Sequence, residues 1–501
     1  MGIAPEWMLT IAGYLLPLFL MSIRTKSLGL KNYLFHTGMI GAFGFFLSFL
    51  WLFQYSFIGG WLIWLMFMVV WVLLSVGLYW SMLVPGVFRP FLVGLVWAVH
   101  DAIRHWGVFS FPFGALGYSQ GGNPFIRSLA WDGGVPLVAF FLGFTASTLY
   151  ELFIGHSAGT KRNGNTRYLF FVLSLVLLIS VRGVWNFHQL DTLEPVDSLS
   201  ATFVQPGMDP WNIQGPEGVV HTAVRGSHTH PVSSERHLVV WPETSVLHDL
   251  RHVLDPEKES TSEIHWGFVS EPYRDALAEY FLGSESFHLV GSLEAAGMKT
   301  FYNTATHIAK GQVKGTYRKV ELVPFAEASA GISLLDNLVY RILPEPGIQW
   351  IAGNAFHPLN IAGWQIATPI CYEDLFPRAA VAFRGNGAQV LLGLNNGEWA
   401  GSLLFLQQHE NVARFRAIET GLAFYRSGNN GMSAGFSPSG RLLWRIDSHV
   451  LSARVYLHRY NTLEGFYSRF SSYMDLITLA LVGTISLVLG LTAFLNRGTI
   501  Q

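Results

Sequence analysis

Cysteine and charged residues are what this chain of 501 residues has least of. Cys371 is its single cysteine, so the chain cannot form an internal disulfide or build a zinc site from several thiolates. Charged residues make up 13% of the chain, against about 25% in a typical globular protein. The formal net charge is −1. We therefore expect no nucleic-acid partner and no strongly basic surface.

Two kinds of motif are also missing. The sequence contains no glycine-rich phosphate loop and no His/Cys cluster with the spacing of metal ligands, so we expect neither a metal nor another cofactor. A lone cysteine is more often a small apolar core residue than a reactive group. Other parts of the chain must therefore supply the reason to give Cys371 a chemical role.

Long apolar runs are abundant and unevenly distributed. Half of the residues are hydrophobic, and a membrane-spanning helix needs about 20 predominantly apolar residues. The pattern predicts a membrane domain with about six transmembrane helices at 1–195, a soluble domain at 196–470 and a C-terminal transmembrane helix at 471–501. The 59–87 run could form one tilted helix or two helices broken near Gly77. The expected spans are 6–23, 33–55, 59–87, 90–107, 133–155, 167–186 and 473–496.

The basic residues of the short loops predict the orientation of these spans. Lys and Arg concentrate in cytoplasmic loops. Here they gather in the first and fifth connections, whereas the second connection carries no charge. This alternation places the N-terminus and the 196–470 domain outside the cytoplasm and returns Arg497 to the cytoplasm. The residues of the two basic connections are Arg24, Lys26, Lys31, Lys161, Arg162 and Arg167.

Two charges interrupt the fourth apolar run. In VWAVHDAIRHWG, Asp101 and Arg104 lie three residues apart, on one helix face where they can pair. A charged side chain costs about 2.5–3.5 kcal/mol at the centre of a membrane helix, so such groups usually face protein or a polar cavity. Two interpretations stay open: an ion pair that orders the bundle, or a polar group beside a substrate cavity.

The 196–470 region alternates short β-rich runs with helical segments. Residues 405–421 show the pattern of an amphipathic helix that ends at Gly421. Strands that alternate with helices favour an α/β layered fold. The expected strands are 200–206, 237–243, 287–294, 299–309, 364–373 and 389–396.

Three ionisable residues stand at or near the ends of such runs. Glu243 ends LVVWPE, Lys319 lies in GTYRKVELVPFAE, and Cys371 follows WQIATPI. A thiol with its ordinary pKa of about 8.5 is mostly protonated at neutral pH and needs a base beside it. A carboxylate can take that proton and return it to a leaving group, and an ammonium can stabilise a tetrahedral oxyanion. Together the three groups supply what nucleophilic catalysis at a carbonyl requires.

The motifs VVWPET, YRKVELVPFAE and PICYEDLFP, in this order, resemble the Glu–Lys–Cys signature of the nitrilase (carbon-nitrogen hydrolase) superfamily. The nearer likeness is to its membrane branch, the apolipoprotein N-acyltransferases. The likeness extends to VQPGMDPW, QQHENVARFRAIETG and RSGNNGMSAGFSPSGR, and into the apolar region through HDAIRHWGVFSFPFGALGYSQ. It therefore covers most of residues 90–450.

The resemblance implies a polytopic α-helical membrane bundle joined to an α/β nitrilase-like domain, a four-layer α-β-β-α sandwich. It further implies a multi-pass protein of the bacterial inner membrane with the catalytic domain on the periplasmic side. The expected reaction moves an acyl chain from a phospholipid, through a cysteine thioester, to the α-amino group of a diacylglyceryl-cysteine on an apolipoprotein. The partners are then the phospholipid donor, the apolipoprotein acceptor and membrane lipids.

Carried onto this sequence, the family pattern makes Glu243 the general base, Lys319 the oxyanion stabiliser and Cys371 the nucleophile. The residues that match the supporting part of the family's site are Glu327, Tyr372 and Glu373, and the candidates on the substrate side are Trp211 and Trp399.

One loop departs from the family pattern and leaves the acyl acceptor open. Where the family has an Asn-Asp-x-Trp-Phe-like loop, this chain reads NNGEWAG, with Asn396 in place of Asp and Ala400 in place of Phe. If water resolved the thioester, the protein would be a membrane-anchored amidase or nitrilase-like hydrolase, or a conjugation-associated relative with another acceptor. A third alternative is a transport or scaffold protein, against which the intact Glu243, Lys319 and Cys371 argue.

Overall fold

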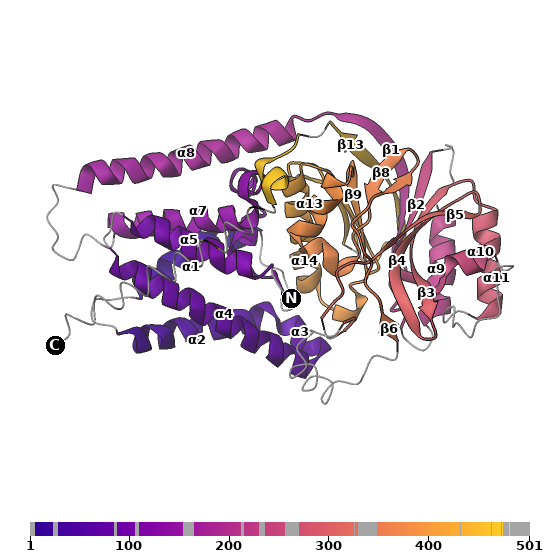
Figure 1. The fold of residues 1–501 in the computed structure, drawn as a ribbon, viewed down its shortest axis with the longest axis horizontal. Coiled ribbons are helices and arrows are strands. Elements are labelled where there is room, and N and C mark those ends of the chain that lie inside the picture. Colours follow the sequence, from indigo (N-terminus) through magenta and orange to yellow (C-terminus); the bar gives the residue numbers. More distant parts are fainter. Residues whose placement is uncertain are drawn as a thin grey trace. The chain divides into compact units, whose positions relative to one another are not determined.

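The computed structural model of the chain divides into two compact units (Figure 1). The helical unit comprises Met1–Leu190 and Glu464–Gln501, and the sheet unit comprises Asp191–Leu463. The structure describes residues 6–23, 29–84, 88–105, 110–153, 165–211, 215–229, 236–255, 270–324, 326–328, 348–430, 432–461, 463–471, 473 and 480.

Apolar helices build the helical unit. Their bounds are α1 (Glu6–Ser22), α2 (Leu30–Ser48), α3 (Leu50–Tyr55), α4 (Phe57–Leu83), α5 (Arg89–Ile103), α6 (Pro124–Arg127), α7 (Ala130–Phe153) and α8 (Asn165–Asp191), with the 3-10 turn η1 (Leu116–Gln120) between α5 and α6. In the described part of the chain, three helical stretches are long and apolar enough to cross a membrane: Phe57–Leu83, Ala130–Phe153 and Phe170–Asp191.

The structure answers one question that the sequence left open and corrects one expected span. Helix α4 is continuous through Gly77 and ends at Leu83, so the 59–87 run is not broken near Gly77. The 33–55 run instead divides at Phe49, which is non-helical and separates α2 from α3. The expected span at 473–496 lies outside the described residues except for positions 473 and 480.

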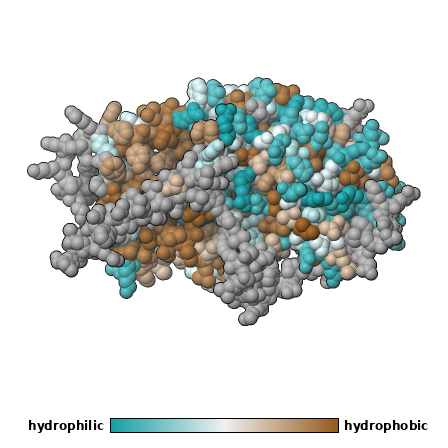
Figure 2. All heavy atoms as spheres, in the orientation of Figure 1, coloured by the Kyte–Doolittle hydropathy of each residue, from teal (hydrophilic) through white to brown (hydrophobic). Residues whose placement is uncertain are grey.

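Hydrophobic side chains cover the outside of the helical unit. Phe35, Phe153 and Phe170 are 65%, 77% and 75% exposed, and Figure 2 shows hydrophobic residues gathered over these helices and mainly hydrophilic ones over the sheet unit. Soluble proteins rarely expose apolar patches larger than a few hundred Å². Because lipid tails suit such a surface as a solvent, we infer that this unit lies in a membrane.

Asp101 of α5 and Arg104, the residue after that helix, have separate hydrogen-bond partners. Of the two interpretations that the sequence left open, the structure therefore does not show the ion pair. No ion pair joins Asp101 and Arg104, both of which are described. Asp101 accepts hydrogen bonds from the backbone N–H groups of Leu116 (3.0 Å) and Gly117 (2.8 Å). Arg104 donates to the carbonyl of Phe113 and lies over phenylalanine rings of α2 and α4. Both charges therefore hold the segment after α5 against the bundle.

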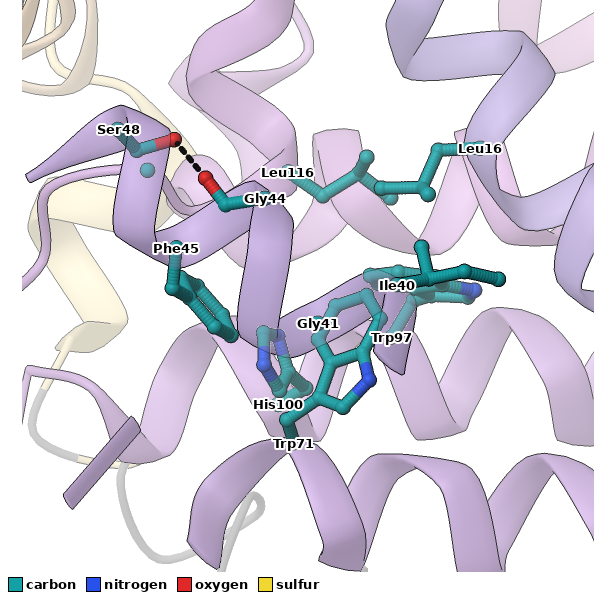
Figure 3. A pocket seen from close by; sticks show the side chains of 11 residues that line it. Leu16, Ile40, Gly41, Gly44, Phe45, Ser48, Trp71, Trp97, His100 and Leu116 are labelled. Atoms are coloured by element: carbon teal, nitrogen blue, oxygen red, sulfur yellow. Dashed lines mark hydrogen bonds between the residues drawn. The ribbon is translucent and has the colours of Figure 1, made fainter. Parts of the chain in front are cut away.

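A cavity of about 160 Å³ lies among α1, α2, α4 and α5 (Figure 3). Gly41 forms part of its wall, because a Cβ there would come within 2.3 Å of the Trp71 ring nitrogen. Trp97 and His100 line the same cavity. His100 Nδ1 lies 3.2 Å from Asp101 Oδ1. The cavity thus has aromatic walls and one histidine that leads to a buried carboxylate.

Two sheets build the sheet unit. One is seven-stranded in the order β13-β1-β2-β3-β4-β5, with β6 paired to β4, and the other is six-stranded in the order β12-β11-β10-β9-β8-β7. The strands are β1 (Pro195–Val204), β2 (His237–Asp249), β3 (Phe287–Gly297), β4 (Thr300–Ala309), β5 (Gln312–Arg318), β6 (Gln349–Trp350), β7 (Leu359–Ile361), β8 (Trp364–Ala367), β9 (Val390–Asn395), β10 (Phe424–Gly428), β11 (Ser433–Phe436), β12 (Leu442–Ile446) and β13 (Ser452–Tyr460).

Helices cover the outer faces of both sheets (Figure 1). Their bounds are α9 (Gly215–His228), α10 (Leu250–Leu254), α11 (Glu271–Leu282), α13 (Pro377–Gly385) and α14 (Leu403–Thr420), and the short 3-10 turns are η4 (Cys371–Leu375) and η5 (Glu398–Ala400). Helix α14 ends at Gly421, whose φ of 64° gives the left-handed C-terminal stop that the sequence predicts.

Alternation along β2 shows how the layers form. Leu238 and Val240 lie in the core cluster that joins the two sheets. Trp241, on the opposite face, belongs to the cluster that also contains Val220 of α9 and Phe281 of α11. Successive side chains of a strand point to opposite faces, so β2 contributes to two cores at once. With α13 and α14 against the second sheet, the layers follow the order α-β-β-α, which confirms the expected fold class.

Candidate active site

Glu243, Lys319 and Cys371 come from three separate elements of the sheet unit and meet at one place. Glu243 lies in β2, Lys319 directly follows β5, and Cys371 begins η4. Lys319 Nζ lies 3.5 Å from Glu243 Oε1, and the Glu243 carboxyl and the Cys371 thiol are near enough that each affects the pKa of the other. The structure thus gathers the three residues that the sequence singled out.

Strand β2 does not end at Glu243 as the sequence predicts. It continues to Asp249 with shifts in its register to β3, and Thr244 adopts a φ of 52°. Gly291 of β3 permits this irregular path, because a Cβ there would come within 2.2 Å of the Pro242 carbonyl oxygen. The bulged backbone therefore places Glu243 in the site while the strand goes on.

The Glu243 carboxyl is buried, and two hydrogen bonds hold it in addition to the ammonium of Lys319. Oε1 accepts a hydrogen bond from Asn303 Nδ2 (2.9 Å), and Oε2 accepts one from the backbone N–H of Asn396 (3.0 Å). Burial raises the pKa of Glu243, the ammonium of Lys319 lowers it, and the carboxyl of Glu327 raises it, with a net shift upward. A carboxylate with a raised pKa is a stronger base, which suits a group that takes a proton from a thiol.

Lys319 is fully buried between two carboxylates. Its Nζ donates to Glu327 Oε1 at 2.8 Å and lies 3.5 Å from Glu243 Oε1. Burial lowers the pKa of Lys319, but the carboxylates of Glu327 and Glu243 outweigh it and the net pKa shift is upward. Lys319 is therefore a fixed cation, and Glu327 is the nearer of its two anionic partners; the supporting role of Glu327 in the reaction stays a prediction.

Cys371 does not lie in a strand, which corrects the expected strand at 364–373. Strand β8 ends at Ala367 and Cys371 begins η4 with a φ of 50°. A non-glycine residue in this left-handed region costs about 1–3 kcal/mol and persists only where its surroundings hold it. Burial raises the pKa of the Cys371 thiol well above its ordinary value, as does the charge of Glu243, against the opposing effect of Lys319. The resting thiol is protonated and depends on a base.

Glu373 ties the cysteine turn to the lysine segment. Its Oε1 accepts hydrogen bonds from Tyr317 Oη (2.8 Å) and from the backbone N–H groups of Val320 (2.6 Å) and Glu321 (3.1 Å). Its Oε2 accepts one from the backbone N–H of Ile370 (2.7 Å). One fully buried carboxylate thus links the segment that contains Lys319 to the residue that precedes Cys371.

The remaining residues named from the sequence lie at the margin of this arrangement. Tyr372 is buried, and its ring packs edge-on against Phe376 with 4.8 Å between centroids. Trp211 is 45% exposed, and its ring lies edge-on to Trp350 at 6.0 Å. Trp399 belongs to η5, but its side chain lies outside the described part of the structure. Their roles stay predictions.

Sequence reasoning missed Asn303. Its Nδ2 lies 2.9 Å from Glu243 Oε1 and 3.4 Å from Glu327 Oε1, and its carbonyl accepts the backbone N–H of Lys319 at 2.8 Å. One residue of β4 thus orients both carboxylates and the lysine. The signal available in the sequence was an amide within the apolar strand run KTFYNTATHIA, which no motif distinguishes from an ordinary polar position.

The arrangement can perform acyl transfer through a covalent intermediate. It contains a protonated thiol, together with a buried base and a permanent cation whose charges both act on that thiol. Water-excluded sites make such charges more effective on a developing oxyanion than they are in water. Within the residues that the structure describes, no group of His, Cys, Asp or Glu is arranged to hold a metal ion.

Two protein families match this chain over separate regions. The family described as carbon-nitrogen hydrolase matches residues 204–452. The family described as the apolipoprotein N-acyltransferase N-terminal domain matches residues 4–148.

Individual relatives agree with these matches. Apolipoprotein N-acyltransferase 2 of Treponema denticola is 28% identical over 434 residues, which cover 80% of this chain and 77% of the relative. The apolipoprotein N-acyltransferase of Pseudomonas putida is 28% identical over 361 residues, which cover 70% of this chain and 65% of the relative. The chain thus spans somewhat less than two thirds of the Pseudomonas relative. An amidase structure from Nesterenkonia sp. is 16% identical with a TM-score of 0.35, and the match covers 55% of this chain and 94% of the amidase.

Proposed function

Because this chain belongs to the apolipoprotein N-acyltransferase family, we propose that it moves a fatty acyl chain from a phospholipid to the α-amino group of a diacylglyceryl-cysteine at the N-terminus of a lipoprotein. The observation that carries the proposal is that Glu243, Lys319 and Cys371 gather at one place in a chain whose other unit exposes an apolar surface.

The first half-reaction forms a thioester. Glu243 takes the thiol proton as the Cys371 sulfur attacks the ester carbonyl carbon of the phospholipid. Lys319 stabilises the tetrahedral oxyanion. When the carbon–oxygen bond to the glycerol breaks, Glu243 returns the proton to the departing alkoxide, so that a lysophospholipid leaves and the acyl group stays on sulfur.

In the second half-reaction Cys371 is the leaving group, while Glu243 and Lys319 keep their roles. The lipoprotein amine attacks the thioester carbonyl, and Lys319 again faces the oxyanion. Glu243 accepts the proton that the amine loses and returns it to the Cys371 thiolate as the carbon–sulfur bond breaks. The products are an amide and the original thiol, so the cycle needs no cofactor.

The surrounding groups suit this cycle. Because the carboxylates of Glu327 and Glu243 keep Lys319 protonated despite its burial, the cation persists through both half-reactions. Asn303 and the backbone of Asn396 hold the base while its proton comes and goes. Glu327 supplies a second negative charge, so Glu243 can become neutral without leaving the lysine unpaired.

We further propose that the protein is a multi-pass protein of a bacterial inner membrane with its sheet unit on the periplasmic side. The alternation of basic and uncharged loops supports this orientation. Phospholipid donors and lipid-anchored acceptors are both membrane components, so a site attached to membrane helices reaches both.

A labelled donor tests the first half-reaction. We expect purified full-length protein, given phospholipid with a labelled acyl chain, to form an adduct on Cys371 that hydroxylamine releases. The matched control is Cys371→Ala, which keeps the fold and removes the nucleophile. An unlabelled wild-type protein, or equal labelling of both proteins, would overturn the proposal.

A further inference from the structure

Three buried polar side chains, those of Asp374, His409 and Arg426, form a chain of contacts beside the cysteine turn. The contacting atoms are Asp374 Oδ1 and His409 Nε2, and His409 Nδ1 lies 3.1 Å from a terminal nitrogen of Arg426. Arg426 Nε closes the group at 4.0 Å from Asp374 Oδ2. The three side chains are at most 2% exposed and come from η4, α14 and β10.

The chemistry of arginine settles the protonation of this chain. A guanidinium can only donate hydrogen bonds, so His409 Nδ1 accepts and the ring proton lies on Nε2, from which it is donated to Asp374. The imidazole is then neutral. Burial lowers the pKa of His409, the charge of Asp374 raises it and that of Arg426 lowers it, with a net shift downward, in agreement with a neutral ring. One negative and one positive charge thus cancel across a neutral bridge.

The location of this chain matters more than its stability. Asp374 lies three residues after Cys371 in the same turn, next to Glu373, whose carboxyl holds the opposite side of the turn to the lysine segment. Asp374 holds the turn to α14 and β10 instead. The carbonyl of Leu375 accepts a further hydrogen bond from this side. The strained backbone of Cys371 is therefore fixed from two directions by two consecutive carboxylates.

We propose that Asp374, His409 and Arg426 are positioning residues for the nucleophile: a buried, charge-balanced chain that holds the Cys371 turn against Glu243 and keeps the charge of Asp374 from acting on the thiol unopposed. The inference deepens the proposed acyl transfer and rests on it for the second of its two tests, but not for the first.

The balance of charge around the thiol makes the proposal testable. The charged groups that act on Cys371 are Glu243 of β2, Glu327, Asp374 of η4, Lys319 after β5 and Arg426 of β10. Glu410 of α14 acts on Arg426 as well and is itself paired with Arg445. Removing the charge of Asp374 should therefore lower the pKa of the Cys371 thiol, and removing that of Arg426 should raise it. Damage to the fold would instead change the reactivity of the thiol in the same direction in both variants.

The first test needs no acyl donor. Full-length protein in detergent is alkylated with iodoacetamide at a fixed pH below the thiol pKa, where the rate follows the thiolate fraction. Asp374→Asn keeps an oxygen that accepts from His409 and loses the charge, so we expect a rate about tenfold above wild type. Arg426→Gln loses the opposing charge, so we expect a rate about tenfold below it. Each rate is measured against the variant's circular dichroism and melting temperature.

The second test separates position from charge. His409→Leu removes the bridge, and we expect thioester formation from phospholipid to slow by about 10²-fold, as misplacement of a reacting group by about 1 Å does. His409→Gln, which can still donate to Asp374, should recover most of that rate. KM for the phospholipid should stay unchanged in both variants, because neither alters a lipid contact.

The outcomes decide the proposal cleanly. Alkylation rates of Asp374→Asn and Arg426→Gln that change in the same direction, or that both equal wild type, overturn it. If Arg426→Gln does not fold, an unchanged rate in folded Asp374→Asn overturns it alone. Should wild type take no acyl group from phospholipid, the proposed function fails while the opposite alkylation shifts still support the positioning chain.

Discussion

The buried charges around Lys319 in the sheet unit and those at the end of α5 in the helical unit are satisfied in different ways. Around Lys319 charge meets charge, because its ammonium lies between Glu243 and Glu327. In the helical unit Asp101 meets backbone N–H groups, and Arg104 meets a carbonyl and aromatic rings. Where two carboxylates surround one ammonium, one carboxylate can take up a proton and the ammonium still keeps a counter-charge. A charge that is held by backbone groups instead fixes the position of the segment that supplies those groups.

The largest effect should come from removing the shared cation. Lys319→Met keeps the length and apolar stem of the side chain but leaves Glu243 and Glu327 buried without a cation. We expect thioester formation on Cys371 to fall by about 10³-fold, the effect of losing an oxyanion donor at the upper end of the usual range. The rate is measured by hydroxylamine-sensitive labelling. A Lys319→Met protein with near wild-type labelling would contradict the assignment of Lys319 as the group that stabilises the oxyanion.

Replacement of Glu373, in the same unit, should change how the labelling rate of Cys371 depends on pH. Burial raises its pKa to about 7, against the opposing effect of its hydrogen-bond donors. As pH falls through 7 the carboxyl gains a proton and cannot accept from all four donors, so we expect labelling of Cys371 to slow on the acid side. Glu373→Gln should be about 10–100-fold slower, since it loses one to two charge-assisted hydrogen bonds, and should lose that acid limb.

The control for this prediction lies nearby. Glu321→Gln removes a carboxylate two residues from Lys319 that pairs with Arg378 at the surface, and it should keep both the rate and the acid limb. A Glu373→Gln variant whose pH profile matches that of wild type would show that another group titrates.

A smaller effect, on stability alone, is expected in the helical unit. In the wild-type protein Asp101 accepts hydrogen bonds from two backbone N–H groups. Asp101→Asn keeps the size of the side chain, but its NH2 group faces one of these two donors and cannot accept from it. The loss should be about 1–3 kcal/mol of unfolding free energy, seen as a lower melting temperature in detergent. Alkylation of Cys371 should be unchanged. A faster or slower alkylation in a folded Asp101→Asn protein would mean that the two units do not differ as described.

The smallest effect should follow from Arg104→Lys. Lysine keeps the charge and a donor for the Phe113 carbonyl but stacks less well on the rings that Arg104 covers. We expect a loss of about 0.5–1 kcal/mol in the same melting experiment. A loss larger than that of Asp101→Asn would reverse the order predicted here.

Much of the site could be predicted because its chemistry is written in local motifs. Glu243, Lys319 and Cys371 follow apolar runs, and the resemblance of their three motifs to the nitrilase superfamily placed them in one site. The alternation of strands and helices predicted an α/β layered fold, and the resemblance implied the α-β-β-α sandwich. The long apolar runs predicted helices in the helical unit, but not the division of the 33–55 run at Phe49.

The rest depended on contacts between distant segments. Asn303 is an amide in an ordinary strand until Glu243 and Glu327 are placed beside it. Gly291 has no motif, and its role appears only where Pro242 approaches it. The Asp101–Arg104 pair, one of two interpretations that the sequence left open, does not form for a related reason: helical spacing shows which side chains can meet, but not which backbone groups of a later segment compete for them.

The central claim is that an acyl group passes through Cys371 to an amine. The most direct measurement starts from wild-type protein whose Cys371 already carries a labelled acyl group and adds a diacylglyceryl-cysteine peptide, with peptide and free fatty acid followed by mass spectrometry. The account predicts loss of label from Cys371 matched by an amide on the peptide's α-amino group. Label recovered as free fatty acid, with the peptide unmodified, would contradict it and make the protein a hydrolase.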